Sequence, residues 1–165
     1  MFKKVQKLFN GFTLIELVVT VAIVGVLATA AMPMLQMTYQ RNKESELRAN
    51  LRQIREAIDA FKKASDEGRI QKSIDETGYP SNLEVLVDGV IDAKDVNKNK
   101  IKFLRRIPID PMLPKDKIEI DDIASNWGLR SYESDAKTPK EGRDVYDVYS
   151  LSEQIGINGV PYAMW

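Results

Sequence analysis

GFTLIELVVTVAIVGVLATAAMPMLQ, residues 11–36, is the stretch that decides the fold of this chain. Glu16 is its only charged residue, and about 20 consecutive apolar residues are enough to cross the hydrocarbon core of a bilayer. A secretory signal peptide would have a shorter apolar core followed by a small-residue cleavage site. The segment Ala28 to Ala31 resembles such a site, but the apolar run continues past it. The pattern therefore predicts a transmembrane helix over residues 12–36.

The residues before this run predict its orientation and its processing. Three lysines, at positions 3, 4 and 7, precede the apolar residues, and a basic flank stays on the cytoplasmic side of a membrane. A peptidase that cuts beside the membrane needs a small residue before the scissile bond, and Gly11 supplies one. We expect residues 1–11 to be a leader peptide whose removal gives Phe12 a new amino group. The rest of the chain would then lie outside the cytoplasm.

Glu16 is the unusual residue of the predicted transmembrane helix. A lone carboxylate within the hydrocarbon costs about 2.5–3.5 kcal/mol on insertion scales. Three interpretations remain open: it pairs with the Phe12 ammonium of a neighbouring copy, it meets the N-terminus of its own helix, or it lies at headgroup level with its charge in water.

The pattern becomes amphipathic after the membrane segment, over residues 37–64. Apolar residues recur there at intervals of three and four, as on one helical face: Leu47, Leu51, Ile54, Ile58 and Phe61. One continuous helix from about Phe12 to Lys63 is predicted. Pro33 should loosen or kink it near the carbonyl of Thr29, either as a membrane-helix proline without function or with a role in assembly.

The remaining residues, 65–165, predict a small α+β domain. A short second helix is expected around residues 83–90, and a charged loop over 94–102. Three runs have the composition of strands: 127–133, 144–150 and 160–165. A small antiparallel sheet packed on the amphipathic half of a long N-terminal helix is the predicted architecture.

Composition excludes several classes of function. The formal net charge is zero, and loss of residues 1–11 would leave 24 acidic against 21 basic side chains, which does not suit nucleic-acid binding. The chain has no cysteine and no histidine, so disulfides, thiol chemistry and the usual general base are missing. Four carboxylates of the C-terminal half could form a site in a membrane-anchored enzyme or binding module, although a solvated surface explains them more simply: Glu133, Glu141, Asp144 and Asp147.

The segment Gly11 to Val19, preceded by Lys3 and Lys4, resembles the class III signal sequence of type IV pilins and type II secretion pseudopilins. The resemblance implies cleavage after Gly11 by a prepilin peptidase, N-methylation of Phe12, and a role for Glu16 in docking into a growing filament. Pro33 falls where members of this superfamily commonly have a helix-weakening proline.

Beyond the helix, the chain is similar to the major pseudopilins of type II secretion, the general secretion pathway protein G family. The similarity rests on four short elements: Tyr79-Pro80, Asp110-Pro111, Trp127-Gly128 with Tyr132, and Asp147 to Leu151. The similarity implies that residues 65–165 form a C-terminal globular pseudopilin domain. One departure is an insertion at residues 112–125, which separates the Asp-Pro from the Trp-Gly element and is expected to form a surface loop.

The second departure concerns calcium, which members of the family bind in an Asp-rich loop. Residues 152–160 contain one carboxylate, Glu153, whereas calcium takes six to eight oxygen ligands. We therefore expect no cofactor and no classical metal site, with Glu153, Asp121 and Asp122 as the only candidate calcium ligands. The loop would instead be fixed by burial of apolar side chains: Ile155, Ile157, Val160 and Tyr162.

The resemblance implies that the chain is a structural subunit without catalytic activity. Many copies would assemble as a helical homopolymer into a periplasmic type II secretion pseudopilus, which promotes protein export across the outer membrane. The expected location is the inner membrane, single-pass, with the C-terminal domain in the periplasm. Expected partners are the lipid bilayer, a prepilin peptidase/methyltransferase, an inner-membrane assembly platform and minor pseudopilins, but no nucleic acid. The alternative is a major type IV pilin of a surface pilus, for adhesion or motility. The absence of cysteine disfavours it, because many such pilins close their C-terminal region with a disulfide.

Overall fold

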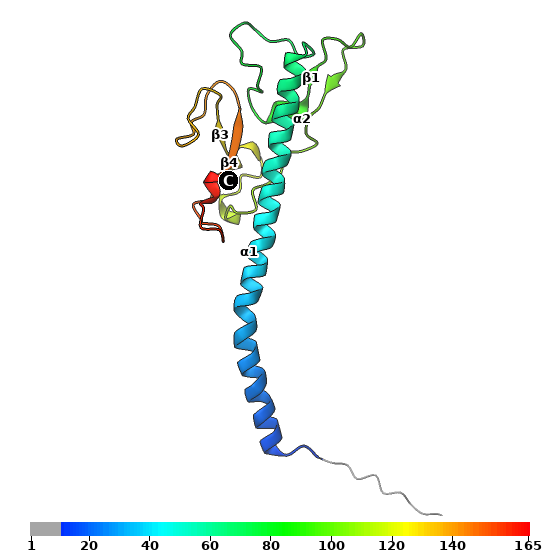
Figure 1. Ribbon diagram of the computed structural model, residues 1–165. Coiled ribbons are helices and arrows are strands. Elements are labelled where there is room, and N and C mark those ends of the chain that lie inside the picture. Colours follow the sequence, from blue (N-terminus) through cyan, green and yellow to red (C-terminus); the bar gives the residue numbers. More distant parts are fainter. Residues whose placement is uncertain (1–10) are drawn as a thin grey trace, which may run out of the picture. The chain divides into compact units, whose positions relative to one another are not determined.

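A computed structural model describes residues 11–165 of the chain, and most of the predicted leader lies outside the described residues. The chain divides into two units, one up to Gln40 and one over Arg41–Trp165. Helix α1, Leu14–Asp66, contributes residues to both (Figure 1). The predicted helix, Phe12 to Lys63, is confirmed within three residues at either end. The helix continues through Pro33.

Helix α1 ends at Asp66 because Gly68 reverses the chain. Gly68 adopts φ 71°, a left-handed conformation that glycine tolerates best. Its N–H donates to the carbonyl of Ser65 at 2.9 Å, and the N–H of Arg69 donates to the carbonyl of Ala64 at 2.9 Å. This pair of bonds is a Schellman motif, which satisfies two carbonyls of the last helical turn.

The core of the second unit lies against the predicted apolar stripe of α1. All five stripe residues, Leu47 to Phe61, are buried. They belong to one cluster with residues from the C-terminal domain, which include Leu83, Leu86, Trp127, Val145, Val148 and Tyr162. The amphipathic half of the helix is therefore the scaffold on which this domain is built.

Short elements complete the domain and give it the α+β character of a pilin-like fold. Helix α2, Glu84–Asp88, is the predicted second helix. Strands β3, Trp127–Arg130, and β4, Asp147–Ser150, pair antiparallel. The register sets Gly128 opposite Tyr149, whose ring would lie 2.3 Å from an added Cβ, so any larger residue would have to displace that ring. The strands are nevertheless shorter than predicted, since Ser131 and Val145 bond outside the ladder.

Two features differ from the sequence predictions. The prediction of a third strand over residues 160–165 is wrong. Tyr162–Met164 forms a 3-10 helix, and Pro161 makes only an isolated bridge with Ile155. Proline has no N–H to donate and so cannot continue a ladder. An unpredicted hairpin joins β1, Val90–Ile91, to β2, Lys100–Ile101, and closes the charged loop.

The insertion at residues 112–125 is a loop with two single-turn 3-10 helices, η1 at Lys115–Lys117 and η2 at Ala124–Asn126. Met112 and Leu113 at its start are buried, and so is Ala124 near its end. The residues between are mostly exposed, which confirms a surface loop for that part.

Candidate functional site: the N-terminal helix and the C-terminal loop

Helix α1 begins with a reciprocal pair of contacts between Thr13 and Glu16. The Glu16 N–H donates to Thr13 Oγ1 at 3.3 Å, while the Thr13 N–H donates to Glu16 Oε2 at 3.2 Å. The Thr13 hydroxyl also donates to Oε2, at 3.0 Å. This is a capping box, in which a threonine and the residue three positions later satisfy each other's N–H groups. The carboxylate also lies at the positive end of the helix dipole.

Within a single chain, Glu16 therefore adopts the second of the three arrangements considered above, in which it meets its own helix N-terminus. Both bonds that it accepts end on Oε2, and Oε1 accepts none from residues 11–165. One carboxylate oxygen remains open to another group.

The first part of α1 presents apolar side chains outward. From Phe12 to Tyr39 the large hydrophobic residues are exposed, with Leu14 at 82% and Val24 at 63%. Within residues 11–165, α1 is the one helix long and apolar enough to cross a membrane. Thr20, Thr29 and Thr38 each donate a hydroxyl to a carbonyl of the preceding turn, at 2.7–2.9 Å. These hydroxyls would therefore bring no unpaired donor into lipid.

The predicted processing residues lie just before α1, and the predicted assembly residues lie within it. Gly11 and Phe12 precede the first helical turn and are exposed, and Pro33 lies inside α1. Cleavage and methylation at Gly11 and Phe12, and assembly through Glu16 and Pro33, stay predictions.

The C-terminal loop is fixed differently from the sequence prediction. Tyr162 is fully buried, as predicted, but Ile155, Ile157 and Val160 are 60%, 41% and 38% exposed, so burial of these three is wrong. The loop is instead held by Glu44 of α1, whose side chain is buried. Glu44 Oε1 accepts from the Ile157 N–H at 2.7 Å and from the Tyr162 hydroxyl at 3.0 Å.

The side chains of this loop supply too few oxygen ligands for a classical calcium site. Glu153 is exposed, and Asp122 Oδ1 accepts the Ser125 N–H within the insertion. No group of three or more acidic side chains close enough for a metal occurs in the described part of the chain. Calcium prefers several charged oxygens, and this loop supplies one carboxylate. The buried Glu44 instead accepts the protein's own N–H and O–H donors. Whether the protein binds calcium stays a prediction, tested below.

The four carboxylates considered for an enzyme or binding site mostly serve the fold. Asp147 pairs with Arg55 at 2.7 Å and with Arg130 at 2.9 Å. Asp144 accepts the Tyr132 N–H at 2.9 Å and the Thr77 hydroxyl, and Glu133 pairs with Arg143 at 2.7 Å.

A fifth carboxylate, Asp110 of the Asp-Pro element, is completely buried. It accepts the Ser150 hydroxyl at 2.6 Å and the Met112 N–H at 2.7 Å. Burial raises the pKa of Asp110, because it disfavours the charged form more than these two bonds favour it. These contacts join β4 to the start of the insertion.

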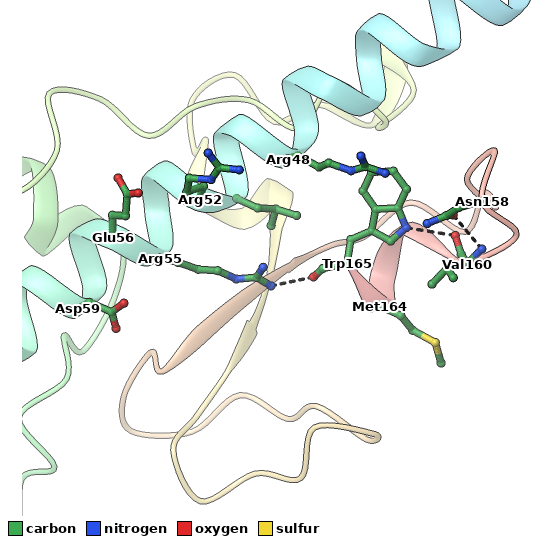
Figure 2. Close-up of a pocket in the computed structure, with 10 residues that line it drawn as sticks. Arg48, Arg52, Arg55, Glu56, Asp59, Asn158, Val160, Met164 and Trp165 are labelled. Carbon is green, nitrogen blue, oxygen red and sulfur yellow. Dashed lines mark hydrogen bonds between the residues drawn. The ribbon is translucent and has the colours of Figure 1, made fainter.

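Sequence reasoning missed Glu44 and Arg55 as the side chains that attach the C-terminal residues to α1. Arg55 donates to Asp147, to the Val148 carbonyl at 3.0 Å and to a main-chain oxygen of Trp165 at 2.8 Å (Figure 2). A signal for Glu44 was present: it lies three residues before Leu47, on the apolar stripe. A carboxylate on a buried helical face requires a donor partner.

Comparison with known proteins adds independent information. A family model described as the prokaryotic N-terminal methylation motif matches residues 7–32. The chain is 31% identical over 106 residues to the type II secretion system core protein G of Pseudomonas aeruginosa, covering 62% of this chain and 67% of that protein. Identity to the Escherichia coli protein of the same name is 29% over 144 residues, which cover 73% of this chain and 92% of that protein.

The chain is also similar to pilins. It is 39% identical over 70 residues to the type IV major pilin protein PilA of Myxococcus xanthus, covering 42% of this chain and 31% of that protein. No solved structure matches the chain.

Proposed function

The chain belongs to the type II secretion system core protein G family and is a pseudopilin, and we propose that, once processed, it polymerises into a periplasmic pseudopilus that promotes protein export across the outer membrane. The observation that supports this most is the start of α1: from Leu14 to Gln40 the helix is apolar and exposed, its only charge is the Glu16 carboxylate, and Oε1 of that carboxylate accepts no bond from residues 11–165.

Processing would come first. Hydrolysis of the Gly11–Phe12 peptide bond adds one water, leaves a carboxyl group on Gly11 and frees the amino group of Phe12. The methyltransferase would then transfer a methyl group from a methyl-donating cosubstrate to this amine, whose nitrogen forms the new N–C bond and releases a proton, while the donor keeps the electrons of its broken bond to the methyl group. The methylated nitrogen stays basic, so it remains an ammonium. The leader lysines are lost with residues 1–11, and the helix then starts with a positive charge next to Thr13. The prepilin peptidase/methyltransferase is the proposed partner at this stage.

Docking would follow at the same place. Glu16 Oε2 satisfies Thr13 of its own chain, while Oε1 can accept the Phe12 ammonium of a copy already in the filament. The pair reduces the cost of a carboxylate in hydrocarbon. Exposed apolar side chains of α1 would exchange lipid for the helices of neighbouring copies as subunits leave the inner membrane through its assembly platform. Minor pseudopilins would be further members of the filament.

The test is Glu16→Ala, with Glu46→Ala as the matched control, since Glu46 is an exposed glutamate in the second half of the same helix. Glu16→Ala removes a membrane charge, so we expect normal insertion but no filaments when the chain is expressed with its secretion apparatus. Glu46→Ala should assemble normally. Normal filaments from Glu16→Ala would contradict the docking role.

A surface type IV pilus is the second candidate, because of the similarity to PilA of Myxococcus xanthus. That match covers 31% of the pilin, whereas the match to the Escherichia coli core protein G covers 92% of that protein. Loss of protein secretion without loss of surface motility in a deletion strain would support the secretion role, and the opposite result the pilus.

A further inference from the structure

A groove lies between α1 and the C-terminal residues of the second unit, with a volume of about 620 Å3. Figure 2 shows Arg48 and Arg52 of the helix at one end and Glu56 and Asp59 further along it. The apolar side chains of Val160 and Met164 line the other wall and are 38% and 72% exposed. The groove is therefore polarised, with a cationic end, an acidic end and an apolar wall.

The charges of the groove are only partly used by the fold. Arg55 is committed to Asp147 and Trp165, and the guanidinium of Arg48 stacks 4.3 Å from the centre of the Trp165 ring. The stacking occupies the face of the guanidinium, and the N–H groups at its edge form no ion pair with a carboxylate of the described residues. Arg52 is exposed and forms no ion pair with any residue between 11 and 165. Two arginines at one end are thus available to an acidic segment.

The insertion at residues 112–125 has the complementary pattern. Its first part carries Lys115 and Lys117, with Asp116 between them, and its second part carries Glu119, Asp121 and Asp122. Ile120, between the acidic residues, is 80% exposed. Asp121 and Asp122 make no ion pair with the described residues. The segment offers an apolar side chain for the wall, carboxylates for Arg48 and Arg52, and lysines for Glu56 and Asp59.

The groove and the insertion lie on opposite sides of α1. Ile123 of the insertion lines a different hollow, with Glu46, Asn50 and Gln53. These helix residues precede Arg48, Arg52 and Arg55 by two positions each, and two positions turn an α-helix by about 200°. The insertion of a chain therefore faces away from the groove of that chain. A second copy can bring the two together.

We propose that the groove of one copy binds residues 115–122 of the next copy. Because the two surfaces differ, the contact is heterologous, and a heterologous contact that does not close into a ring extends into a helical filament. This inference rests on the proposed filament function and adds a contact between the globular domains to the one between the helices. The insertion, which departs from the family pattern, then serves assembly.

The experiment uses the full chain, which has no native cysteine. Filaments are prepared from cells that carry Arg52→Cys together with Asp121→Cys, and are oxidised. We expect a ladder of covalent oligomers. Each single variant should give no ladder, and a mixture of the two single variants should stop at dimers. Glu67→Cys with Asp121→Cys is the matched control pair, since Glu67 is exposed beyond the end of α1, and it should give no ladder.

Charge reversal provides the second measurement. Asp121→Lys with Asp122→Lys should lower the yield of filaments roughly tenfold, because it opposes like charges across the contact. Adding Arg48→Glu and Arg52→Glu should restore most of the yield. Glu67→Lys with Asp75→Lys makes the same change of charge elsewhere and should leave the yield unchanged.

The outcomes separate this inference from the proposed function. Filaments that form normally but give no ladder overturn the groove contact and leave the filament role intact. A crosslink from the groove cysteine only to a different protein also overturns it. If the unsubstituted chain forms no filaments with its secretion apparatus, the proposed function fails and the inference fails with it.

Discussion

The two halves of α1 share one helical backbone but differ in what surrounds it. From Leu14 to Gln40 the large hydrophobic side chains are exposed, and Glu16 is the only charge. From Arg41 to Asp66 a stripe of apolar residues is buried in the core of the domain, and charged residues occupy the other faces. The second half is stabilised by tertiary packing within the chain. The first half must obtain the same stabilisation from lipid or from other copies.

The two halves also use a glutamate in opposite ways. Glu16 is exposed and caps its own helix, while Glu44 is buried and binds residues more than 100 positions away. Oε1 of Glu16 accepts no bond from residues 11–165, whereas Glu44 accepts bonds that hold the fold together. Substitutions that are matched between the halves should therefore have unequal effects on the stability of the domain.

The largest expected difference is between two isoleucines of the same helix. Ile54 is fully buried and Ile23 is 55% exposed. Ile54→Ala should lower the free energy of unfolding by about 2–5 kcal/mol, because it removes buried methylenes and leaves a cavity. Ile23→Ala should leave it unchanged. Urea unfolding of the full chain in detergent, followed by the fluorescence of the buried Trp127, measures both. Equal losses would mean that the first half of α1 shares the cooperative core.

The next effect concerns Glu44. Glu44→Ala should lower the free energy of unfolding by about 1–3 kcal/mol, since it removes the carboxylate oxygen that accepts from the Ile157 N–H and the Tyr162 hydroxyl. Glu44→Gln should cost less, because an amide oxygen can still accept. Glu46→Gln is the control on the exposed surface and should stay within about 0.5 kcal/mol. The same urea experiment applies. No loss in Glu44→Ala would show that the C-terminal loop is held by other contacts.

Much of this contrast was predictable from the sequence. The apolar run before Gln40 and the periodic stripe from Leu47 to Phe61 are local patterns, so they gave the helix and the buried face correctly. In β4 the side chains alternate between the two faces of the strand, and Val148 and Ser150, which share one face, are both buried. The α+β class followed from these elements.

What the sequence did not predict depends on contacts between distant residues. The position of Glu44 on the apolar stripe indicates that it needs a donor, but not which one, because Glu44 meets Ile157 and Tyr162 only after the C-terminal segment has folded against α1. The isoleucines near residues 155–157 were predicted to be buried because of their hydrophobicity, yet a carboxylate fixes the loop instead. The failed strand at residues 160–165 has a local cause, Pro161, that could have been weighted more.

The stability of the domain that follows α1 should depend on pH, because Asp92 forms an ion pair with Arg69. Two nitrogens of Arg69 donate to Asp92 Oδ2, at 2.6 and 3.0 Å, and the Lys94 N–H donates to Oδ1. The bonds from Arg69 first, and then that from Lys94, lower the pKa of Asp92. A lowered folded-state pKa contributes stability above the unfolded pKa, which is near 3.9, and this contribution disappears as the pH falls.

Asp92→Asn should therefore be less stable than the unsubstituted chain at pH 7. The difference should shrink as the pH falls through the carboxyl range and vanish once Asp92 is protonated in both states. Asp88→Asn, at the exposed end of α2, is the control and should show no such trend. Urea midpoints at a series of pH values between about 2.5 and 7 give the curve. A difference that is constant with pH would contradict the proposed role of the Arg69 pair.

The smallest expected effect is that of calcium. Because Glu44 already holds the C-terminal loop through the Ile157 N–H and the Tyr162 hydroxyl, and Glu153 is the only carboxylate among residues 152–160, we expect the same thermal unfolding midpoint with excess calcium and with chelator. A structural ion at 100 times its Kd would contribute about 2.7 kcal/mol, a shift too large to overlook. Glu44→Ala should be destabilised equally in both conditions. A midpoint that rises with calcium and falls with chelator would mean that an ion, and not Glu44 alone, holds the loop to the second half of α1.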